Sequence, residues 1–443
     1  MAVASGSSAF AEHRVWLDEL LRGILQGHPI GAELIDLGLD GHSAAEARRL
    51  LPLDFRRSVG AFFTPSTLRA EVSAILRDIP GRRYLDPTCG AGDLLLAAAD
   101  HLPIKRTLRE TIANWNSHLA GWDLHKEFIQ TTQRRIVLHA AKRHLLATGS
   151  ARWKNSDYDG FLTQIQVGNA SENLHDTGGK HDVVLLNPPY VRVPVQRPDI
   201  SWAGGSTSSA AIFLLDAVDY LDNGAHIVAI LPDSLRSGTN FSKWRAAVEA
   251  KSDVKLVRNS GQFDQHTDID VFLLVLQVRS HGPSNKDVEW WPKVDHSVTV
   301  SDRFDVRVGT VVDNRDPLEG KNYPFLVARD LPTSGTSTAP KRRRRFSGRV
   351  FTPPFVVIRR TSRPAGKNTV ARSNGVLITG KSAIAIDNHL IVATPRSGTV
   401  EECKQLLRVL DSPSTTSSLD DRIRCRHLTV GTVRELPWIE DQT

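Results

Sequence analysis

The sequence predicts an α/β protein with a mostly parallel, doubly wound sheet, a short helical segment before it and a β-rich region after it. Residues 10–57 show helical spacing of apolar residues and no strand-like runs. Residues 84–278 alternate short apolar strands with helical stretches, which is typical of a parallel sheet with helices on both faces. After Gly282 the pattern changes to short strands, turns and basic loops. We therefore expect three parts, over residues 1–57, 58–282 and 283–443.

The first part is expected to be helical because it contains two amphipathic stretches, VWLDELLRGIL and SAAEARRLLPLDF. In the sheet region the expected strands are RRYLD, LAGWD, IQVGN, DVVLLN, AHIVAILP, VKLVRN and VFLLVLQV. The expected helices are LLLAAAD, HKEFIQTTQRRIVLHAAKRHLL, AAIFLLDAVDYL and FSKWRAAVEA. Sheets of this kind bind ligands at the carboxyl ends of their strands, so polar residues at those ends are candidate site residues.

The third part contains the strand-like stretches FDVRVGTVV, FVVIRR, GVLITGKSAIAI and HLIVAT, and its length is ordinary for a separate domain. A basic block lies in this part, within a stretch rich in Ser, Thr, Pro and Gly. Its members are Lys341, Arg342, Arg343, Arg344 and Arg345. Such a block is either a solvated loop or a set of phosphate contacts.

Composition sets broad limits on the class of protein. A formal net charge of +7 over 443 residues only weakly favours a nucleic-acid partner. The three cysteines, Cys89, Cys403 and Cys425, have neither disulfide-framework nor metal-ligand spacing, so we expect no metal and a reducing compartment. The first residues lack a basic segment followed by an apolar run, and no stretch has the apolar length of a membrane span. We expect a cytoplasmic protein.

A glycine-containing turn follows the first expected strand, in LDPTCGAGD. Asp86 ends the strand, and Gly90 and Gly92 precede the next helix, so a ligand can approach the backbone at the helix N-terminus. The turn has neither the GxGxxG spacing of a dinucleotide site nor the GK[ST] ending of a phosphate-binding loop. Binding of NAD or ATP is therefore disfavoured.

Three other polar residues are placed where they can contribute to the same site. Asp123 ends the strand LAGWD, a position from which a carboxylate usually binds ribose hydroxyls. Asn169 ends the strand in VGNA, and its amide can meet an adenine edge. Thr64, in GAFFTP, offers a hydroxyl beside the free N–H groups of a helix that begins close to it.

The stretch DVVLLNPPYVR takes a buried apolar strand directly into Asn187, Pro188, Pro189 and Tyr190. Two successive prolines remove two backbone donors and fix a rigid, extended path. One interpretation is a stiff strand exit with an Asn cap. The other is a set of preoriented acceptors, the Asn187 side-chain oxygen and the Pro188 carbonyl, beside the Tyr190 ring. The tetrapeptide alone leaves both open.

The ordered set GAFFTP, DPTCGAG, GWD, GNA and NPPY resembles the amino-group (N6-adenine) DNA methyltransferases of the gamma arrangement, over about residues 50 to 280. The resemblance implies a Rossmann-like methyltransferase sheet over 58–282, preceded by the small helical segment, and a β-rich target-recognition region over 283–443. It also implies S-adenosylmethionine as the cofactor. Asp86, Gly90 and Gly92 would line its site, Asp123 would bind the ribose and Thr64 the methionine carboxylate. Asn169 would contact adenine, although many members have an acid there.

The resemblance also implies a catalytic role for the NPPY segment. The exocyclic amine of adenine is a poor nucleophile because its lone pair is delocalised, and Asn187 with the Pro188 carbonyl would draw its N–H bonds out of plane. The base must leave the duplex to reach such a pocket, so aromatic walls are expected around it. Tyr190, after Pro189, is one wall, and Phe263, in NSGQFDQHTDIDVFLLVLQV, occupies the place of the second.

The implied function is site-specific methylation of adenine in double-stranded DNA, in a restriction-modification or phage-defence system. The basic block would then contact DNA phosphates. Cleavage would need a separate restriction endonuclease or defence subunit, because the sequence shows no nuclease signature and no phosphate-binding loop. The alternatives are methylation of RNA adenine, protein glutamine or the cytosine amine. A non-enzymatic alternative is a DNA-specificity subunit with a relict methyltransferase fold.

Overall fold

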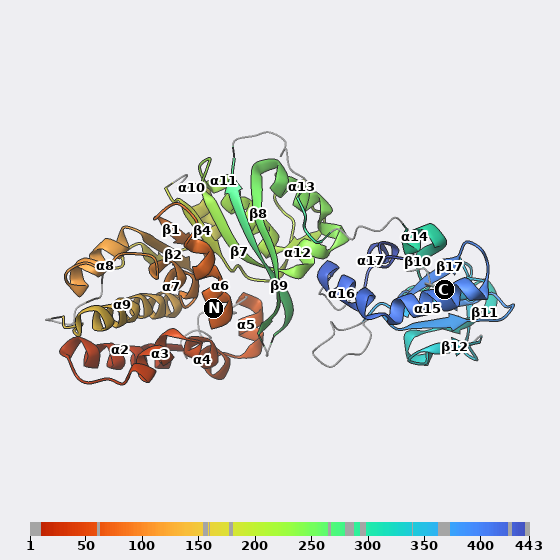
Figure 1. The fold of residues 1–443 in the computed structure, drawn as a ribbon, viewed down its shortest axis with the longest axis horizontal. Helices are drawn as coiled ribbons and strands as arrows, with labels where there is room; N and C mark the ends of the chain where they lie inside the picture. The colour runs from red at the N-terminus through yellow and green to blue at the C-terminus, as the bar shows by residue number, and fades with distance from the viewer. Residues whose placement is uncertain are drawn as a thin grey trace. The chain divides into compact units, whose positions relative to one another are not determined.

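A computed structural model describes residues 10–59, 63–153, 158, 160–176, 180–264, 267–279, 288–292, 298–338, 340–361, 373–423 and 428–438. The chain divides into two compact units, each with its own core. Unit 1 comprises Met1–Leu235 and Ser242–Val288, and unit 2 comprises Arg236–Phe241 and Glu289–Thr443. Figure 1 shows the elements of both.

Unit 1 is built on a seven-stranded sheet with the order β3-β2-β1-β4-β7-β9-β8. The first five strands in this order are parallel, and β9 and β8 are antiparallel to their neighbours. The prediction of a mostly parallel α/β sheet is therefore confirmed. The strands are β1 (Tyr84–Asp86), β2 (Leu119–Asp123), β3 (Ile165–Val167), β4 (Val183–Leu186), β7 (His226–Pro232), β8 (Ser252–Asp264) and β9 (Thr267–Val278).

The central strands β4 and β7 are apolar except for His226 at the start of β7. Every residue of β4 and β7 is buried, as expected for strands enclosed on both faces. One helical group beside β1 to β3 is α7 (Asp93–Ala99), α8 (Leu108–Asn116) and α9 (Lys126–Thr148). A second helical group consists of α10 (Ala170–Asp176), α11 (Ser209–Tyr220) and α13 (Ser242–Lys251). In this group α11 contacts β7, α13 contacts β8, and α10 contacts α11. Short elements complete this part: α6 (Ser66–Leu76), β5 (Arg192–Pro194), β6 (Ser206–Ser208) and α12 (Asp233–Ser237).

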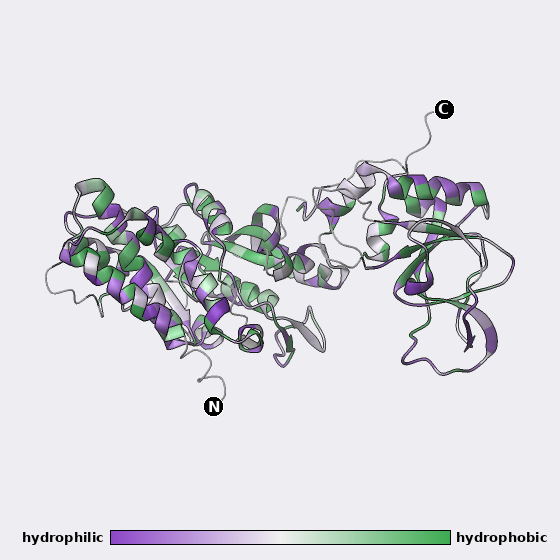
Figure 2. Cartoon of the chain, turned by 90° about the horizontal axis from the view of Figure 1, so that it is seen from below, coloured by the Kyte–Doolittle hydropathy of each residue, from purple (hydrophilic) through white to green (hydrophobic). Residues whose placement is uncertain are grey.

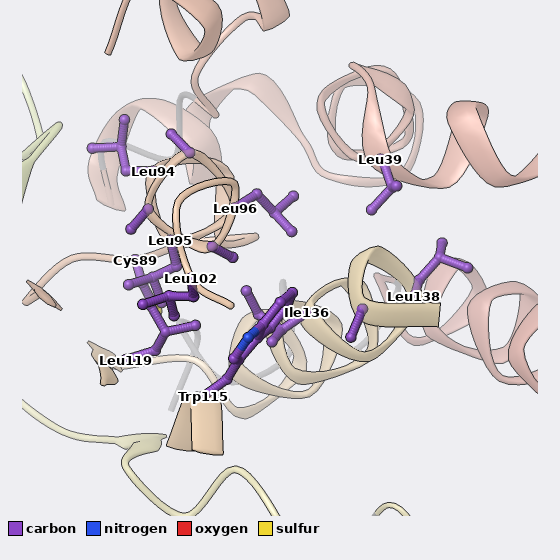
Figure 3. Packing of buried hydrophobic residues seen from close by; sticks show 14 of the residues in the cluster. Leu39, Cys89, Leu94, Leu95, Leu96, Leu102, Trp115, Leu119, Ile136 and Leu138 are labelled. Atoms are coloured by element: carbon purple, nitrogen blue, oxygen red, sulfur yellow. The ribbon is translucent and has the colours of Figure 1, made fainter. Parts of the chain in front are cut away.

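The helical segment predicted over residues 1–57 belongs to unit 1. Its helices are α2 (Ala11–Gln26), α3 (Ala32–Leu39), α4 (His42–Leu50) and α5 (Leu53–Val59). Both α2 and α3 pack on α9, and a Cβ added at Gly38 would lie 2.6 Å from Leu138 Cδ2. Figure 3 shows Leu39 of α3 and Leu138 of α9 within one apolar cluster. The segment therefore extends the core around α9.

Helix α9 packs against α2, α3, α7 and α8, so many of its residues are buried, polar ones included. Figure 2 shows the apolar residues gathered along the central strands and on the inner faces of the surrounding helices. None of the helices in the described ranges combines the length and apolar character needed to cross a bilayer.

Unit 2 contains two sheets and several helices. The five-stranded sheet has the order β10-β17-β14-β15-β12, and the three-stranded sheet has the order β13-β11-β16. The strands are β10 (Phe304–Val308), β11 (Lys321–Leu326), β12 (Gly335–Ser337), β13 (Arg343–Phe346), β14 (Phe355–Arg359), β15 (Gly375–Ile378), β16 (Ala385–Ile386) and β17 (Leu390–Pro395). The helices are α14 (Val300–Arg303), α15 (Val400–Asp411), α16 (Pro413–Arg422) and α17 (Val430–Arg434), with the 3-10 turn η3 (Ala328–Asp330).

The basic block, expected as a loop, corresponds largely to strand β13. Successive residues of a strand point to opposite sides, so the block is divided. Arg344 and Phe346 are buried, whereas Arg343 and Arg345 are exposed. The loop prediction was wrong because β13 pairs with β11 over its whole length.

Candidate active site

Three predicted site residues come from neighbouring strands and lie at one edge of the sheet. Asp123 and Asp86 end β2 and β1, and Asn187 follows β4 directly. Because β2, β1 and β4 are adjacent and parallel, their carboxyl ends share one edge. The structure therefore brings the predicted cofactor residues and the predicted catalytic residues to adjacent positions.

The glycine turn after β1 has a conformation that other residues would strain. Gly90 and Gly92 have φ angles of +52° and +86°. A Cβ at Gly92 would also lie 2.6 Å from Thr132 Cγ2, and the Thr132 hydroxyl donates to the Gly90 carbonyl over 2.8 Å. The turn is therefore held closely against α9, and its conformation is fixed without a ligand.

A buried arginine that was not identified from the sequence stabilises this glycine turn through hydrogen bonds. Arg135 of α9 donates to the Ala91 carbonyl over 2.5 Å and to Asp93 Oδ1 over 2.8 Å. The same guanidinium donates to the carbonyls of Gly38 (3.1 Å) and Leu39 (2.8 Å), at the end of α3. It thus joins the glycine turn to the N-terminal helices. The only sequence signal was an arginine directly before the apolar run Ile136, Val137 and Leu138.

The two carboxylates of this edge have raised pKa values, and burial is the main cause for both. The pKa of Asp86, which is 2% exposed, rises to about 8, against the opposing effect of the Thr88 N–H that it accepts. The pKa of Asp123 rises to about 6, although Asp123 accepts N–H bonds from His125 (2.8 Å) and Gly90 (3.2 Å). Asp86 is buried and Asp123 is half-buried, and neither has a cationic side-chain partner in the described part of the chain. Such acids are typical of a site for a cationic or hydroxyl-rich ligand.

The raised pKa of Asp86 predicts how stability depends on pH. The carboxyl keeps its proton to about pH 8 in the folded chain but only to its usual value of 3.8 in the unfolded chain. The folded state therefore holds more protons between these values, and its free energy of unfolding falls as pH rises. We expect Asp86→Asn to be more stable than wild type at pH 8 by several kcal/mol, with almost no difference near pH 4. Denaturant titrations at both pH values test this, with exposed Asp78→Asn as the control; an equal difference at both would contradict it.

Two apolar residues beside Asp123 were not identified from the sequence. Leu124 is 64% exposed and Val167 is 54% exposed, and Val167 pairs with Asp123 across β2 and β3. Large exposed aliphatic side chains next to a carboxylate at a strand end can cover the face of a ring. Asn169, by contrast, is engaged locally: its Oδ1 accepts from Ser171 N (3.1 Å) and its Nδ2 donates to Glu172 Oε1 (2.8 Å), at the start of α10.

A hydrogen-bonded chain links Thr64, Asn187 and Tyr190. Asn187 Nδ2 donates to the hydroxyl of Thr64 over 2.9 Å, and the Tyr190 hydroxyl donates to Asn187 Oδ1 over 2.8 Å. Tyr190 OH also lies 3.1 Å from the Ile230 carbonyl, and burial raises the pKa of Tyr190, so the hydroxyl remains a donor. The amide of Asn187 is thus held in one orientation. Gly60, Ala61 and Phe62 of the GAFFTP motif lie outside the described residues.

The prolines of the NPPY segment are anchored by the start of α11. The Ser209 hydroxyl donates to the Pro189 carbonyl, and Val191 N donates to the same hydroxyl over 3.3 Å. Pro188 is buried. The segment therefore leaves β4 along one defined path.

Tyr190 and Phe263 are in contact, as expected for residues of one pocket. Their ring centroids are 6.1 Å apart and the rings meet edge to face, at 84°. Phe263 is only 3% exposed. The two rings are therefore not parallel walls in this conformation, and Phe263 would have to turn for a base to stack between them.

The basic block lies in unit 2, and its members have different environments. Arg344 is buried and pairs with Asp313, so it is not available to a ligand as the sequence suggested. Arg342 pairs with Asp330 over 3.0 Å. The exposed members include Lys341 and two arginines bound to carbonyls of the paired strand segment: Arg343 donates to Asn322 O (2.8 Å) and Arg345 to Gly320 O (3.1 Å).

A parallel α/β sheet with a glycine turn after β1, an acid at the end of β2 and Asn-Pro-Pro-Tyr after β4 is typical of methyltransferases that act on amino groups. The chain belongs to the N-6 DNA methylase family, whose model matches residues 54–291, more than half of the sequence. The resemblance inferred from the motifs is confirmed, and the chain is an adenine-specific DNA methyltransferase.

Solved structures are similar to this chain at low sequence identity. A Listeria monocytogenes protein described as a class I S-adenosylmethionine-dependent methyltransferase is 13% identical, covering 64% of this chain and 92% of its own, with a TM-score of 0.39. A modification subunit assigned to a type I restriction enzyme of Vibrio vulnificus is 19% identical (58% and 51%, TM-score 0.39). This chain thus spans about half of that subunit. The type IIG restriction endonuclease BpuSI is 14% identical (99% and 70%, TM-score 0.42).

Proposed function

We propose that this chain transfers a methyl group from S-adenosylmethionine to the N6 amine of an adenine that has been flipped out of double-stranded DNA. The observation that carries the proposal is the hydrogen-bonded chain Thr64–Asn187–Tyr190 at the same sheet edge as Asp86 and Asp123. It gives the target amine an oriented acceptor next to a preformed ligand cradle.

Asn187 would act on the target amine. Its amide oxygen has two lone pairs, and the amine would share this oxygen with the Tyr190 hydroxyl. The Pro188 carbonyl would accept the second N–H bond. Together they would localise the lone pair of the amine and stabilise the positive charge that develops on it during transfer. Thr64, through its bond with Asn187 Nδ2, would keep the amide oxygen turned toward the base.

The residues around the glycine turn fit S-adenosylmethionine. Asp86 would face its positively charged part, since this buried carboxyl has no cationic side-chain partner within the described residues. Asp123 would accept from the ribose hydroxyls, with Leu124 and Val167 against the adenine ring and Asn169 at its edge. Gly90 and Gly92 would let the cofactor approach the backbone. The bound cofactor supplies an activated sulfonium methyl group, so positioning and electrostatics suffice for transfer.

Tyr190 and Phe263 would provide the aromatic surface for the flipped base. Stacking on such rings offsets the stacking that the base loses on leaving the duplex. The resemblance also implies a restriction-modification or defence setting, with cleavage by a separate chain. Residues 283–443, which include most of unit 2, would recognise the target, and residues 58–282 would perform the transfer.

The test is transfer of tritiated methyl groups from S-adenosylmethionine to unmethylated genomic DNA by the full chain. Long-read sequencing of the product should show N6-methyladenine at one recurrent sequence. RNA and purified release-factor protein serve as competing acceptors. Label in either of these but not in DNA would refute the proposal.

The exposed arginines of β13 lead to a prediction about salt dependence. Replacing Arg343 and Arg345 by Ala should weaken binding to all DNA sequences alike and reduce the slope of log K against log salt by about two. The inward Arg344 should behave differently: Arg344→Met should lower the melting temperature of unit 2, because it leaves the Asp313 carboxylate without its partner. Fluorescence anisotropy over a range of salt concentrations checks the first effect. An unchanged slope in the double variant would exclude phosphate contacts by this strand.

A further inference from the structure

Unit 2 contains a groove of about 860 Å³ that the catalytic motifs do not involve. Three segments line it: residues 312–315 after β10, residues 327–329 at η3, and residues 387–389 between β16 and β17. All three belong to the same compact unit, so the groove is a property of unit 2 alone.

The walls of the groove are held in place by backbone hydrogen bonds. Val311 N donates to Ile386 O and Asn388 N donates to Val311 O, each over 2.9 Å. The two segments approach so closely at Gly309 that a Cβ there would lie 2.1 Å from the Asp387 carbonyl oxygen. The turn of the first wall is closed by Val312 N, which donates to Asp316 Oδ2 over 2.7 Å. The groove is therefore preformed.

The acidic residues of the groove are already engaged by protein groups. Asp313 pairs with the buried Arg344, whose guanidinium also donates to the Asp316 carbonyl over 2.7 Å. Asp387 accepts from the backbone N–H and the ring Nδ1 of His389, over 3.1 Å and 2.9 Å. One arginine of the basic block thus supports the wall of the groove, and both acidic side chains of the lining have partners within unit 2.

The remaining polar groups of the lining point to a ligand with both negative charge and hydrogen-bonding edges. Asn314 and Arg315 are exposed, and within the described residues their side chains make no hydrogen bond or ion pair. Arg329 is 71% exposed and lies only 3.9 Å from Asp330, which binds Arg342 more closely. Asn388 Oδ1 is buried and has no hydrogen-bond partner in the described part of the chain.

We propose that this groove reads base edges of the DNA target. Asn and Arg are the side chains that bind adenine and guanine with paired hydrogen bonds, so Asn314 and Arg315 would contact bases. Asn388, whose amide oxygen is buried in this conformation, would do so after its side chain turns into the groove. Arg329, at the rim, would contact a phosphate. The inference deepens the proposed function and rests on it, since it assigns target recognition to named residues of unit 2.

Four variants of the full chain test the groove: Asn314→Ala, Arg315→Lys, Asn388→Ala and Arg329→Ala. The first three should lower methylation of the wild-type site in unmethylated genomic DNA by about 10- to 100-fold and relax the preference at one base each. Arg315→Lys keeps the positive charge but loses the planar guanidinium and its paired donors. The variant therefore separates hydrogen bonding to a base from nonspecific electrostatic attraction to DNA. Arg329→Ala should weaken binding to all sequences alike. Arg408→Ala, an exposed change on α15, is the control and should alter neither site nor rate.

Anisotropy with fluorescent duplexes, measured without methyl transfer, separates this inference from the proposed function. If wild type binds a particular sequence but transfers no methyl group, the proposed function fails and the groove is judged by binding alone. If wild type methylates one site and all three base-reading variants methylate it at the wild-type rate, the groove inference is overturned while the proposed function stands. If wild type shows no sequence preference in either assay, the groove inference also fails.

Discussion

Asn187→Ala should reduce methyl transfer by about 100- to 1,000-fold while leaving S-adenosylmethionine affinity near that of wild type. The substitution removes the side-chain oxygen proposed to accept the target amine, and it leaves the glycine turn and both carboxylates untouched. Tyr190 keeps its bond to the Ile230 carbonyl, so the aromatic ring should remain in place. Single-turnover transfer of tritiated methyl groups and calorimetry of cofactor binding measure the two quantities.

Asn116→Ala is the matched control for this variant. Asn116 also uses both ends of its amide, donating to Thr163 Oγ1 (3.1 Å) and accepting from Gln164 N (3.2 Å). It ends α8, before β2 begins, and so lies at the opposite edge of the sheet from the proposed site. It should lose a similar amount of stability and no activity. Near-wild-type turnover by Asn187→Ala would remove Asn187 from the catalytic step.

Arg135→Met should lower the free energy of unfolding of unit 1 by about 3–5 kcal/mol, since it leaves the buried Asp93 carboxylate without its charged partner. It should also weaken S-adenosylmethionine binding by about tenfold or more, an increment of roughly 1.4 kcal/mol. The reason is that the Ala91 carbonyl loses its anchor, so the glycine turn would have to be ordered by the ligand. Arg135 is a positioning residue in this scheme.

The neighbouring Arg134 provides the control. Arg134 is also buried on α9, but it pairs with Asp18 of α2 over 2.9 Å. Arg134→Met should therefore cost stability without changing cofactor affinity. If Arg135→Met does not fold, Arg135→Lys retains the charge and loses the fork of donors. Equal cofactor affinities in the Arg134 and Arg135 variants would refute the positioning role.

Much of the site was predictable from local sequence. The alternation of strands and helices predicted a parallel sheet, and the ends of the strands could be read from the motifs around Asp86, Asp123 and Asn187. Parallel strands place their carboxyl ends at one edge whatever the detailed packing, so the proximity of these three residues followed from topology alone. The family followed from the order of the same motifs.

The partners of the site residues could not be predicted in this way. Thr64 and Asn187 are hydrogen-bonded across 123 positions of the chain, and Arg135 reaches Gly38 across 97. Neither pairing has a local pattern, because it depends on how α6 and α3 pack against the sheet and α9. The same applies to Asn169, whose amide caps α10 in the structure, although its place at a strand end suggested a ligand contact.

The basic block shows most clearly what the sequence determined and what the tertiary structure decided. The sequence by itself determined that five positive charges would lie together, and a period of two follows once the segment is a strand. Only the pairing of β13 with β11, which sets Arg344 opposite Tyr323, decided that Arg344 points inward to Asp313 while Arg343 and Arg345 face outward. A shift of register by one residue would exchange these roles, because every side chain of a strand changes face with such a shift.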